Sequence, residues 1–121
     1  MLERQLTIAV DFDGVISEHC TWECTGKPGQ ARGDVRQALE MLRQEGWKIV
    51  IYSSRATAEI TPYLLDNEIP FDEVNQNSAR VYGGPKPSAT VYWDDRACCY
   101  SGDALKDLDK IRNFRTWDGR K

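Results

Sequence analysis

Residues Thr7 to Val15, TIAVDFDGV, decide the fold that this sequence predicts. The apolar run at 8–10 is typical of a buried strand, and two carboxylates, Asp11 and Asp13, follow it one residue apart. Alternate residues of an extended chain point the same way, so we expect both carboxylates on one side. Gly14 then lets the backbone turn at the strand's carboxyl end, where open α/β sheets keep their sites. The alternative is a strand end that carries acidic turn residues.

Length and composition indicate one domain spanning residues 1–121, with enough chain for a hydrophobic core. The formal net charge of -3 gives no overall attraction to nucleic acid, and it disfavours a polynucleotide partner. No apolar run approaches the roughly 20 residues that a membrane span needs, and no signal-peptide pattern opens the sequence. We therefore expect a cytoplasmic protein without a membrane partner.

The four cysteines, Cys20, Cys24, Cys98 and Cys99, are expected to be reduced thiols in that compartment. His19 lies beside the first pair and raises the question of a zinc site. However, no second pair stands at a matching distance, and adjacent cysteines chelate poorly, so the spacing disfavours zinc.

Strands and helices alternate along the rest of the sequence. After the first strand, we expect strands at 47–52, 71–74 and 89–93, and helices from about 34 to 46, from about 58–61 to 67, and at 103–111. Pro62 sets the start of the second helix, because proline is tolerated in a helix's first turn. The alternation predicts an α/β fold with a Rossmann-like, doubly wound parallel sheet.

The stretch 15–32 is polar, has no hydrophobic period and contains two glycines and a proline. It predicts a loop or a short β-flap after the first strand. Connections of this length in compact domains are often functional. Trp22, its large aromatic residue, either covers a substrate or packs back on the domain.

Polar side chains gather where the predicted strands end. They come from the first strand, the second strand, the loop before the fourth and the fourth strand itself: Asp11, Asp13, Ser53, Lys86, Asp94 and Asp95. The carboxyl ends of parallel strands meet at one edge of a sheet, so these groups should converge. Four carboxylates repel one another unless protons or a divalent cation neutralise them. Oxygen-only ligands favour Mg²⁺.

In order and spacing, these residues resemble the four motifs of the haloacid dehalogenase (HAD) superfamily. The matching elements are Asp-Phe-Asp-Gly-Val at 11–15, Ser53, Lys86 and Asp94-Asp95. Ile-Tyr-Ser-Ser-Arg at 51–55, with Lys86 ahead of Asp-Asp-Arg, looks like the small capless phosphatase-like members. The resemblance implies an HAD-like fold and a Mg²⁺-dependent phosphatase that forms an aspartyl-phosphate.

The resemblance also implies a role for each residue. Asp11 would be the nucleophile and Asp13 the general acid and base, while Lys86 would offset negative charge. The metal ligands would be Asp11, the backbone carbonyl of Asp13, and Asp94, with Asp95 ligating through water or holding Lys86. Asp13 further favours phosphate esters, because family members that break carbon-halogen bonds lack this second aspartate.

Several other residues carry less specific expectations. Ser53 is favoured over Ser54 as the hydroxyl that binds the phosphoryl group, although the Ser54 backbone N–H could contribute. Arg55 and Arg96 either bind a substrate phosphate or carboxylate, or are solvated residues or ion-pair partners. A further group is expected to be structural: Asn75 as a loop-ordering residue, and Trp47 and Trp93 as core.

HAD enzymes usually carry a cap domain, and neither gap of this sequence can house one. The resemblance therefore implies an open site that acts on a phosphorylated substrate of unknown identity, covered by the 15–32 flap or by a second subunit of a homo-oligomer. Two other classes remain as alternatives. One is a receiver-like phosphate acceptor, disfavoured because strand three ends in Asn75, and the other is a non-catalytic HAD-fold binding module.

Overall fold

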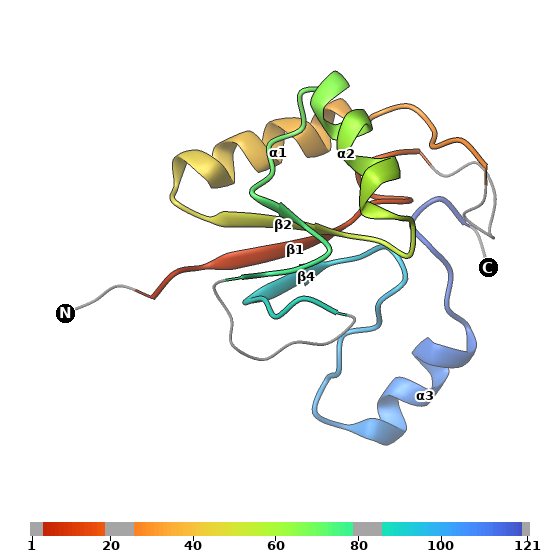
Figure 1. Ribbon diagram of the computed structural model, residues 1–121. Coiled ribbons are helices and arrows are strands. Elements are labelled where there is room, and N and C mark those ends of the chain that lie inside the picture. The colour runs from red at the N-terminus through yellow and green to blue at the C-terminus, as the bar shows by residue number, and fades with distance from the viewer. Residues whose placement is uncertain (1–3, 19–25, 79–85, 120–121) are drawn as a thin grey trace.

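The computed structural model describes residues 4–18, 26–78 and 86–119 and contains a four-stranded, all-parallel sheet. The strands lie in the order β3-β2-β1-β4 (Figure 1). Their bounds are β1 Thr7–Asp11, β2 Lys48–Tyr52, β3 Glu73–Val74 and β4 Val91–Trp93. The predicted α/β class and parallel sheet are confirmed, although β3 and β4 are each two residues shorter than predicted.

Two helices cover one face of the sheet, α1 (Gly33–Gln44) and α2 (Thr57–Asp66). Alternate residues of β1 and β2 point toward these helices and form the core with them. The largest fully buried apolar side chains there are Phe12, Ile16, Leu39, Ile49, Ile51, Ile60 and Leu64. Because neighbouring parallel strands offer long apolar side chains to the same face, this layer removes most of the strands' apolar area from water.

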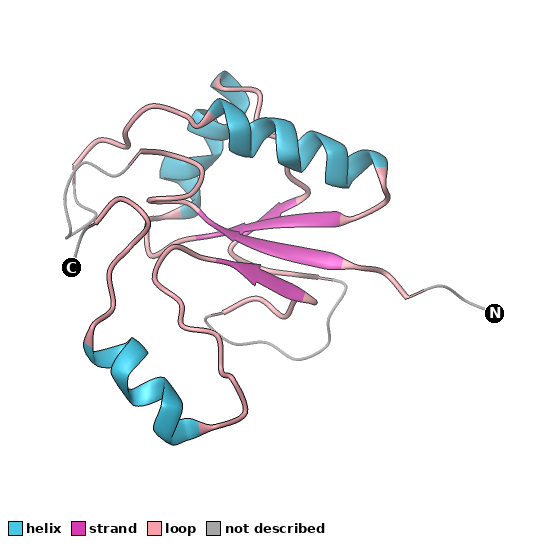
Figure 2. Cartoon of the chain, turned by 180° about the vertical axis from the view of Figure 1, so that it is seen from behind, coloured by secondary structure: helices cyan, strands magenta, loops and turns pink. Residues whose placement is uncertain are grey.

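The third helix, α3 (Ala104–Arg112), lies on the other side of the sheet and apart from it (Figure 2). Asp103 caps its first turn by accepting a hydrogen bond from the Lys106 N–H at 3.3 Å. Its apolar residues Leu105 and Ile111 are exposed by 79% and 58%. The predicted helix is therefore present, but its apolar face does not pack on the sheet.

The start of α2 differs from the prediction. The helix begins at Thr57, so Pro62 is its sixth residue and lies beyond the first turn. Proline has no N–H to donate to the carbonyl four residues earlier, which belongs to Ala58. Both residues are exposed, so water can solvate that carbonyl, which explains why the helix tolerates the proline there.

The two ends of the predicted flap pair with each other. The Glu18 N–H donates to the Gln30 carbonyl and the Arg32 N–H to the Ile16 carbonyl, each at 2.8 Å. Gly29 is required here, because a Cβ at this position would lie 2.0 Å from the Glu18 carbonyl oxygen. Trp22, His19, Cys20 and Cys24 lie outside the described residues.

Two further predictions concern tryptophans. Trp47 is half-buried and packs against the core, as predicted. Trp93 was predicted to be core and is not: it lies on the edge strand β4 and is 36% exposed. No helix in the described part of the chain is long and apolar enough to cross a membrane.

Candidate active site

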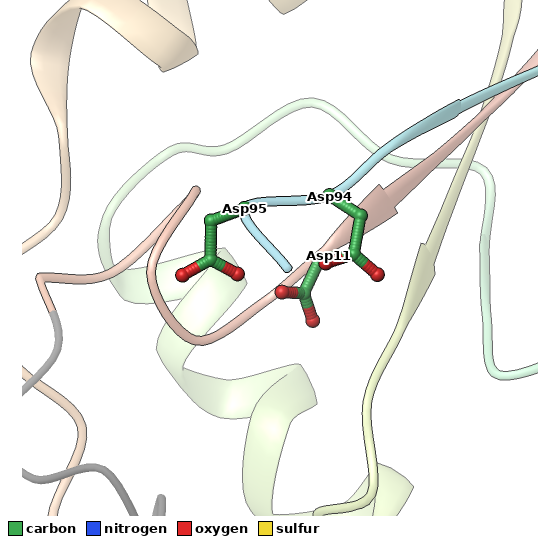
Figure 3. A group of neighbouring side chains, drawn as sticks. All are labelled: Asp11, Asp94 and Asp95. Atoms are coloured by element: carbon green, nitrogen blue, oxygen red, sulfur yellow. The ribbon is translucent and has the colours of Figure 1, made fainter. Parts of the chain in front are cut away.

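Three carboxylates converge at the carboxyl ends of β1 and β4. Asp11 is the last residue of β1, and Asp94 and Asp95 directly follow β4. The parallel register pairs Val10 with Trp93, so the next residue of each strand is an aspartate. One oxygen from each of the three side chains lies within 4.8 Å of the others (Figure 3). This arrangement could hold a metal ion.

Burial and neighbouring charge make Asp11 a weak acid. The pKa of Asp11 rises from 3.8 to about 9, first because the carboxyl is desolvated and then because it shares a hydrogen bond with Asp95. The charges of Asp94, Asp95 and Asp13 raise the pKa further. Without a cation, Asp11 therefore keeps its proton at neutral pH, which lowers the negative charge of the cluster. A divalent cation would replace that proton, and an all-carboxylate donor set fits a hard ion such as Mg²⁺.

Tyr52, on the neighbouring strand, contacts the cluster, and the sequence did not predict this role. Its hydroxyl donates to Asp94 Oδ2 at 2.5 Å, and burial followed by this contact raises its pKa above the ordinary value. Tyr52 ends β2 and pairs in register with Asp11. Its place at the end of a predicted strand was the signal that could have identified it.

Asp13 lies in the turn after β1 and not in the strand, because β1 ends at Asp11. A tight turn begins at Phe12, where the N–H groups of Ile16 and Ser17 both donate to the Phe12 carbonyl at 3.0 Å. Gly14 makes this turn feasible with a φ of 88°. The alternation rule therefore stops at Asp11. Asp13 is not among the three carboxylates whose oxygens come together, although its charge still acts on Asp11.

Arg55 is the partner of Asp13. Its Nε and Nη2 donate to the two carboxylate oxygens at 2.8 and 3.0 Å, a bidentate pair with side chains only 5% and 8% exposed. Its Nη1 donates to the Gly26 carbonyl at 2.6 Å and to Glu59 Oε1 at 2.7 Å. The guanidinium thus ties the flap to Asp13, and these contacts favour the ion-pair alternative for Arg55. Binding of a substrate phosphate by Arg55 stays a prediction.

The loop after β2 is ordered by hydrogen bonds among its own polar residues. Ser53 Oγ accepts from the Arg55 N–H at 3.0 Å, and the Ser53 N–H donates to Asn75 Oδ1 at 2.8 Å. Asn75 has a φ of 61° and also donates to Thr57 Oγ1 at 3.0 Å, so it does order this loop. Ser54 is exposed beside it. Ser53 and Ser54 as phosphate-binding residues stay predictions.

Lys86 lies beside the site rather than within the carboxylate cluster. Its Nζ is 4.1 Å from the centre of the Tyr92 ring, a cation–π contact. Tyr92 in turn meets Tyr52 edge to face, with ring centres 6.5 Å apart. Two aromatic rings therefore connect Lys86 to Asp94, and a catalytic role for this lysine stays a prediction.

The turn after β4 is fixed by a hydrogen bond from the Arg96 N–H to Asp94 Oδ1 at 2.8 Å. Further along the same segment, Cys98 and Cys99 are free and exposed.

Comparison with known proteins adds support for the fold. No family model and no curated protein sequence matches the chain. Among solved structures, the chain is similar to a conserved protein from Bacteroides thetaiotaomicron, with a TM-score of 0.63 and 24% sequence identity. The match covers 96% of this chain and 97% of the other. At this level of identity the similarity establishes a shared fold.

Proposed function

We propose that this chain is a Mg²⁺-dependent phosphomonoester hydrolase of the HAD type, with Asp11 as its nucleophile. The observation that carries the proposal is the convergence of Asp11, Asp94 and Asp95 at the carboxyl ends of two parallel strands. Its second support is the order of the sequence motifs, which resembles that family. The raised pKa of Asp11, which comes from burial and from the neighbouring carboxylates, supports a cluster whose negative charge a cation would balance.

The proposed reaction has two steps. First, an Asp11 carboxylate oxygen attacks phosphorus and the bond to the ester oxygen breaks, so that the leaving alcohol takes a proton from Asp13. Water, deprotonated by Asp13, then attacks the same phosphorus, and the bond to Asp11 breaks to release phosphate. Each step exchanges one P–O bond for another, and the proton that Asp13 gives in the first step returns in the second.

The remaining residues would orient the phosphoryl group and balance its charge. Asp94 and Asp95 would hold Mg²⁺ together with Asp11 and the Asp13 carbonyl, and the ion would supply charge stabilisation to the phosphoryl oxygens. The Ser53 hydroxyl and the Ser54 N–H would donate to those oxygens. Lys86 would reach the same group by leaving the face of Tyr92, since its side chain is exposed.

The ion pair with Arg55 constrains the role of Asp13. Both oxygens of Asp13 accept one hydrogen bond each from the guanidinium, which leaves one lone pair on each oxygen to exchange a proton. In both steps Asp13 would therefore give or take its proton at an oxygen that stays bonded to Arg55.

Hydrolysis of an aryl phosphate, measured with Mg²⁺ and with EDTA, tests the proposal. We expect turnover that requires Mg²⁺ and that falls by at least about 10³-fold in Asp11→Asn, because the nucleophile is lost. Asp66→Asn, on the exposed end of α2, is the control. Turnover that survives in Asp11→Asn would overturn the proposal. Phosphorylation without turnover would instead indicate the receiver-like alternative.

A further inference from the structure

A cavity of about 420 Å³ opens beside two of the three clustered carboxylates, Asp94 and Asp95. Its wall is completed by the turn after β1, by the start of α1 and by the C-terminal segment that follows α3. The side chains that characterise it are aromatic or cationic: Trp93, Phe114, Trp117, Arg32 and Arg115. The volume is within the range of small-molecule sites.

The aromatic wall is held in place by specific contacts. Trp117 Nε1 donates to the Gly14 carbonyl at 2.9 Å, which joins the C-terminal segment to the turn that carries Asp13. The Arg32 guanidinium lies 4.6 Å from the Trp117 ring centre and pairs with Asp34 at 3.1 Å. A ring anchored in this way is preorganised for stacking, since a ligand need not order it.

The same rings remain accessible. Trp117 is 60% exposed and Trp93 is 36% exposed, although a hydrogen bond and a strand fix their positions. Exposed aromatic rings around a pocket with a few polar groups are typical of a ligand-binding site. Arg115, which is also exposed, adds a cation and five N–H donors at the rim.

We propose that this cavity binds the leaving group of the substrate, and that this group carries a nucleobase: the substrate is a nucleoside monophosphate. The inference rests on the proposed function, because the phosphate must reach Asp11 while the base occupies the cavity. A planar base can stack on the indole rings, and Arg115 can donate to its carbonyl or ring-nitrogen acceptors. A sugar phosphate without a base has no planar ring to stack on the indoles.

Ribose 5-phosphate and a nucleoside 5′-monophosphate form the matched pair for the test, because they differ by the base alone. Binding is measured by titration calorimetry without metal in the Asp11→Asn background, where turnover cannot interfere and both ligands present the same phosphate. We expect the nucleotide to bind about 5- to 150-fold more tightly than the sugar phosphate, the range for stacking one base. Trp117→Ala should remove most of this difference and Trp117→Phe should retain part of it.

Tyr100→Ala is the control variant, since Tyr100 is an aromatic residue that is 70% exposed and does not line the cavity. Equal affinity for the two ligands, or a preference that Trp117→Ala leaves unchanged, would overturn the inference. Hydrolysis of ribose 5-phosphate by the wild type with Mg²⁺, a phosphomonoester without an aromatic ring, tests the proposed function separately. Ribose 5-phosphate turnover without a base preference would reject the cavity's role alone. A base preference without any turnover would reject the hydrolase and retain the cavity as a nucleotide site.

Discussion

Both carboxylate oxygens of Asp13 accept hydrogen bonds from Arg55, at 2.8 and 3.0 Å, and both side chains are almost completely buried. The pair joins the turn after β1 to the loop after β2, two segments that are 42 residues apart. The third nitrogen of the same guanidinium binds the Gly26 carbonyl of the flap. One arginine therefore sets the relative positions of three loops around the candidate site.

Breaking this pair should destabilise the fold strongly. Arg55→Gln leaves the Asp13 carboxylate buried without its cation, and removing one partner of a buried pair costs about 3–5 kcal/mol. Urea unfolding followed by circular dichroism measures the change. Glu59→Gln is the control, because this partner of Arg55 is 46% exposed and should cost less than about 1 kcal/mol. Equal losses in the two variants would contradict the account of the pair.

Asp11→Asn should stabilise the metal-free protein at neutral and alkaline pH. The folded pKa of Asp11 is about 9 and the ordinary value is 3.8, so between these values the folded state binds a proton that the unfolded state has released. Stability from this group is therefore complete below about pH 4 and is lost as the pH rises through 9. Asparagine does not ionise, so the variant lacks this pH-dependent loss of stability.

Thermal unfolding in EDTA from pH 4 to 9 checks this expectation. The melting temperature of Asp11→Asn should exceed that of the wild type increasingly toward high pH, by about 4 °C or more for each kcal/mol gained. Mg²⁺ should reduce this difference in melting temperature, since the ion stabilises the wild type and the variant has lost one of the proposed metal ligands. A variant that melts below the wild type at pH 8 in EDTA would show that Asp11 is structural.

Tyr52→Phe should weaken metal binding and leave the fold intact. The substitution keeps the ring and removes the hydroxyl that donates to Asp94 Oδ2. Hydrogen bonds that orient metal ligands are worth about 10- to 100-fold in metal affinity or activity. Calorimetric titration with Mg²⁺ measures the effect. Tyr63→Phe is the control, because its hydroxyl donates to the Gly29 carbonyl at 2.8 Å and touches no carboxylate; a similar loss in both would refute a specific role for Tyr52.

The ion pair between Lys48 and Glu73 should make stability fall in acid. The Lys48 ammonium, 2.6 Å away, and Ser78 lower the pKa of Glu73 from 4.5 to about 2. A depressed pKa contributes stability that is complete above 4.5 and is lost as the pH falls toward 2. In Glu73→Gln the free energy of unfolding should therefore depend less on pH between about 2 and 4.5. Asp109→Asn is the control: its side chain is 88% exposed, and the substitution should leave the pH dependence unchanged. An unchanged acid dependence in Glu73→Gln would exclude the pair as its cause.

The sequence was sufficient to predict the strand ends that form the carboxylate cluster. Apolar runs identify parallel strands. The residue that follows such a run lies at the carboxyl end of its strand, where the site of an open α/β sheet forms, whatever the details of packing. Asp11, Asp94 and Asp95 are of this kind. The position of Lys86 was harder to predict, because Lys86 lies in a loop, and a loop has no hydrophobic periodicity from which its path can be predicted.

The partners of individual side chains could not be predicted in the same way. Asp13 diverges from Asp11 because the chain turns at Phe12, and a turn of this kind depends on hydrogen bonds rather than on residue spacing. Trp117 meets Gly14 across 103 residues, a contact without any local signal. The exposure of Trp93 could not be predicted either. Its strand was predicted correctly, but only the strand order shows that β4 is an edge strand.

The most direct test of the central claim is to trap the phosphorylated enzyme. Wild-type protein is mixed with Mg²⁺ and a phosphomonoester, quenched in acid during turnover, digested and analysed by mass spectrometry. The account predicts a phosphoryl group on the peptide that contains Asp11, and none in Asp11→Asn or in EDTA. Turnover at full rate with the Asp11 peptide unmodified, or a phosphoryl group on another residue, would contradict it.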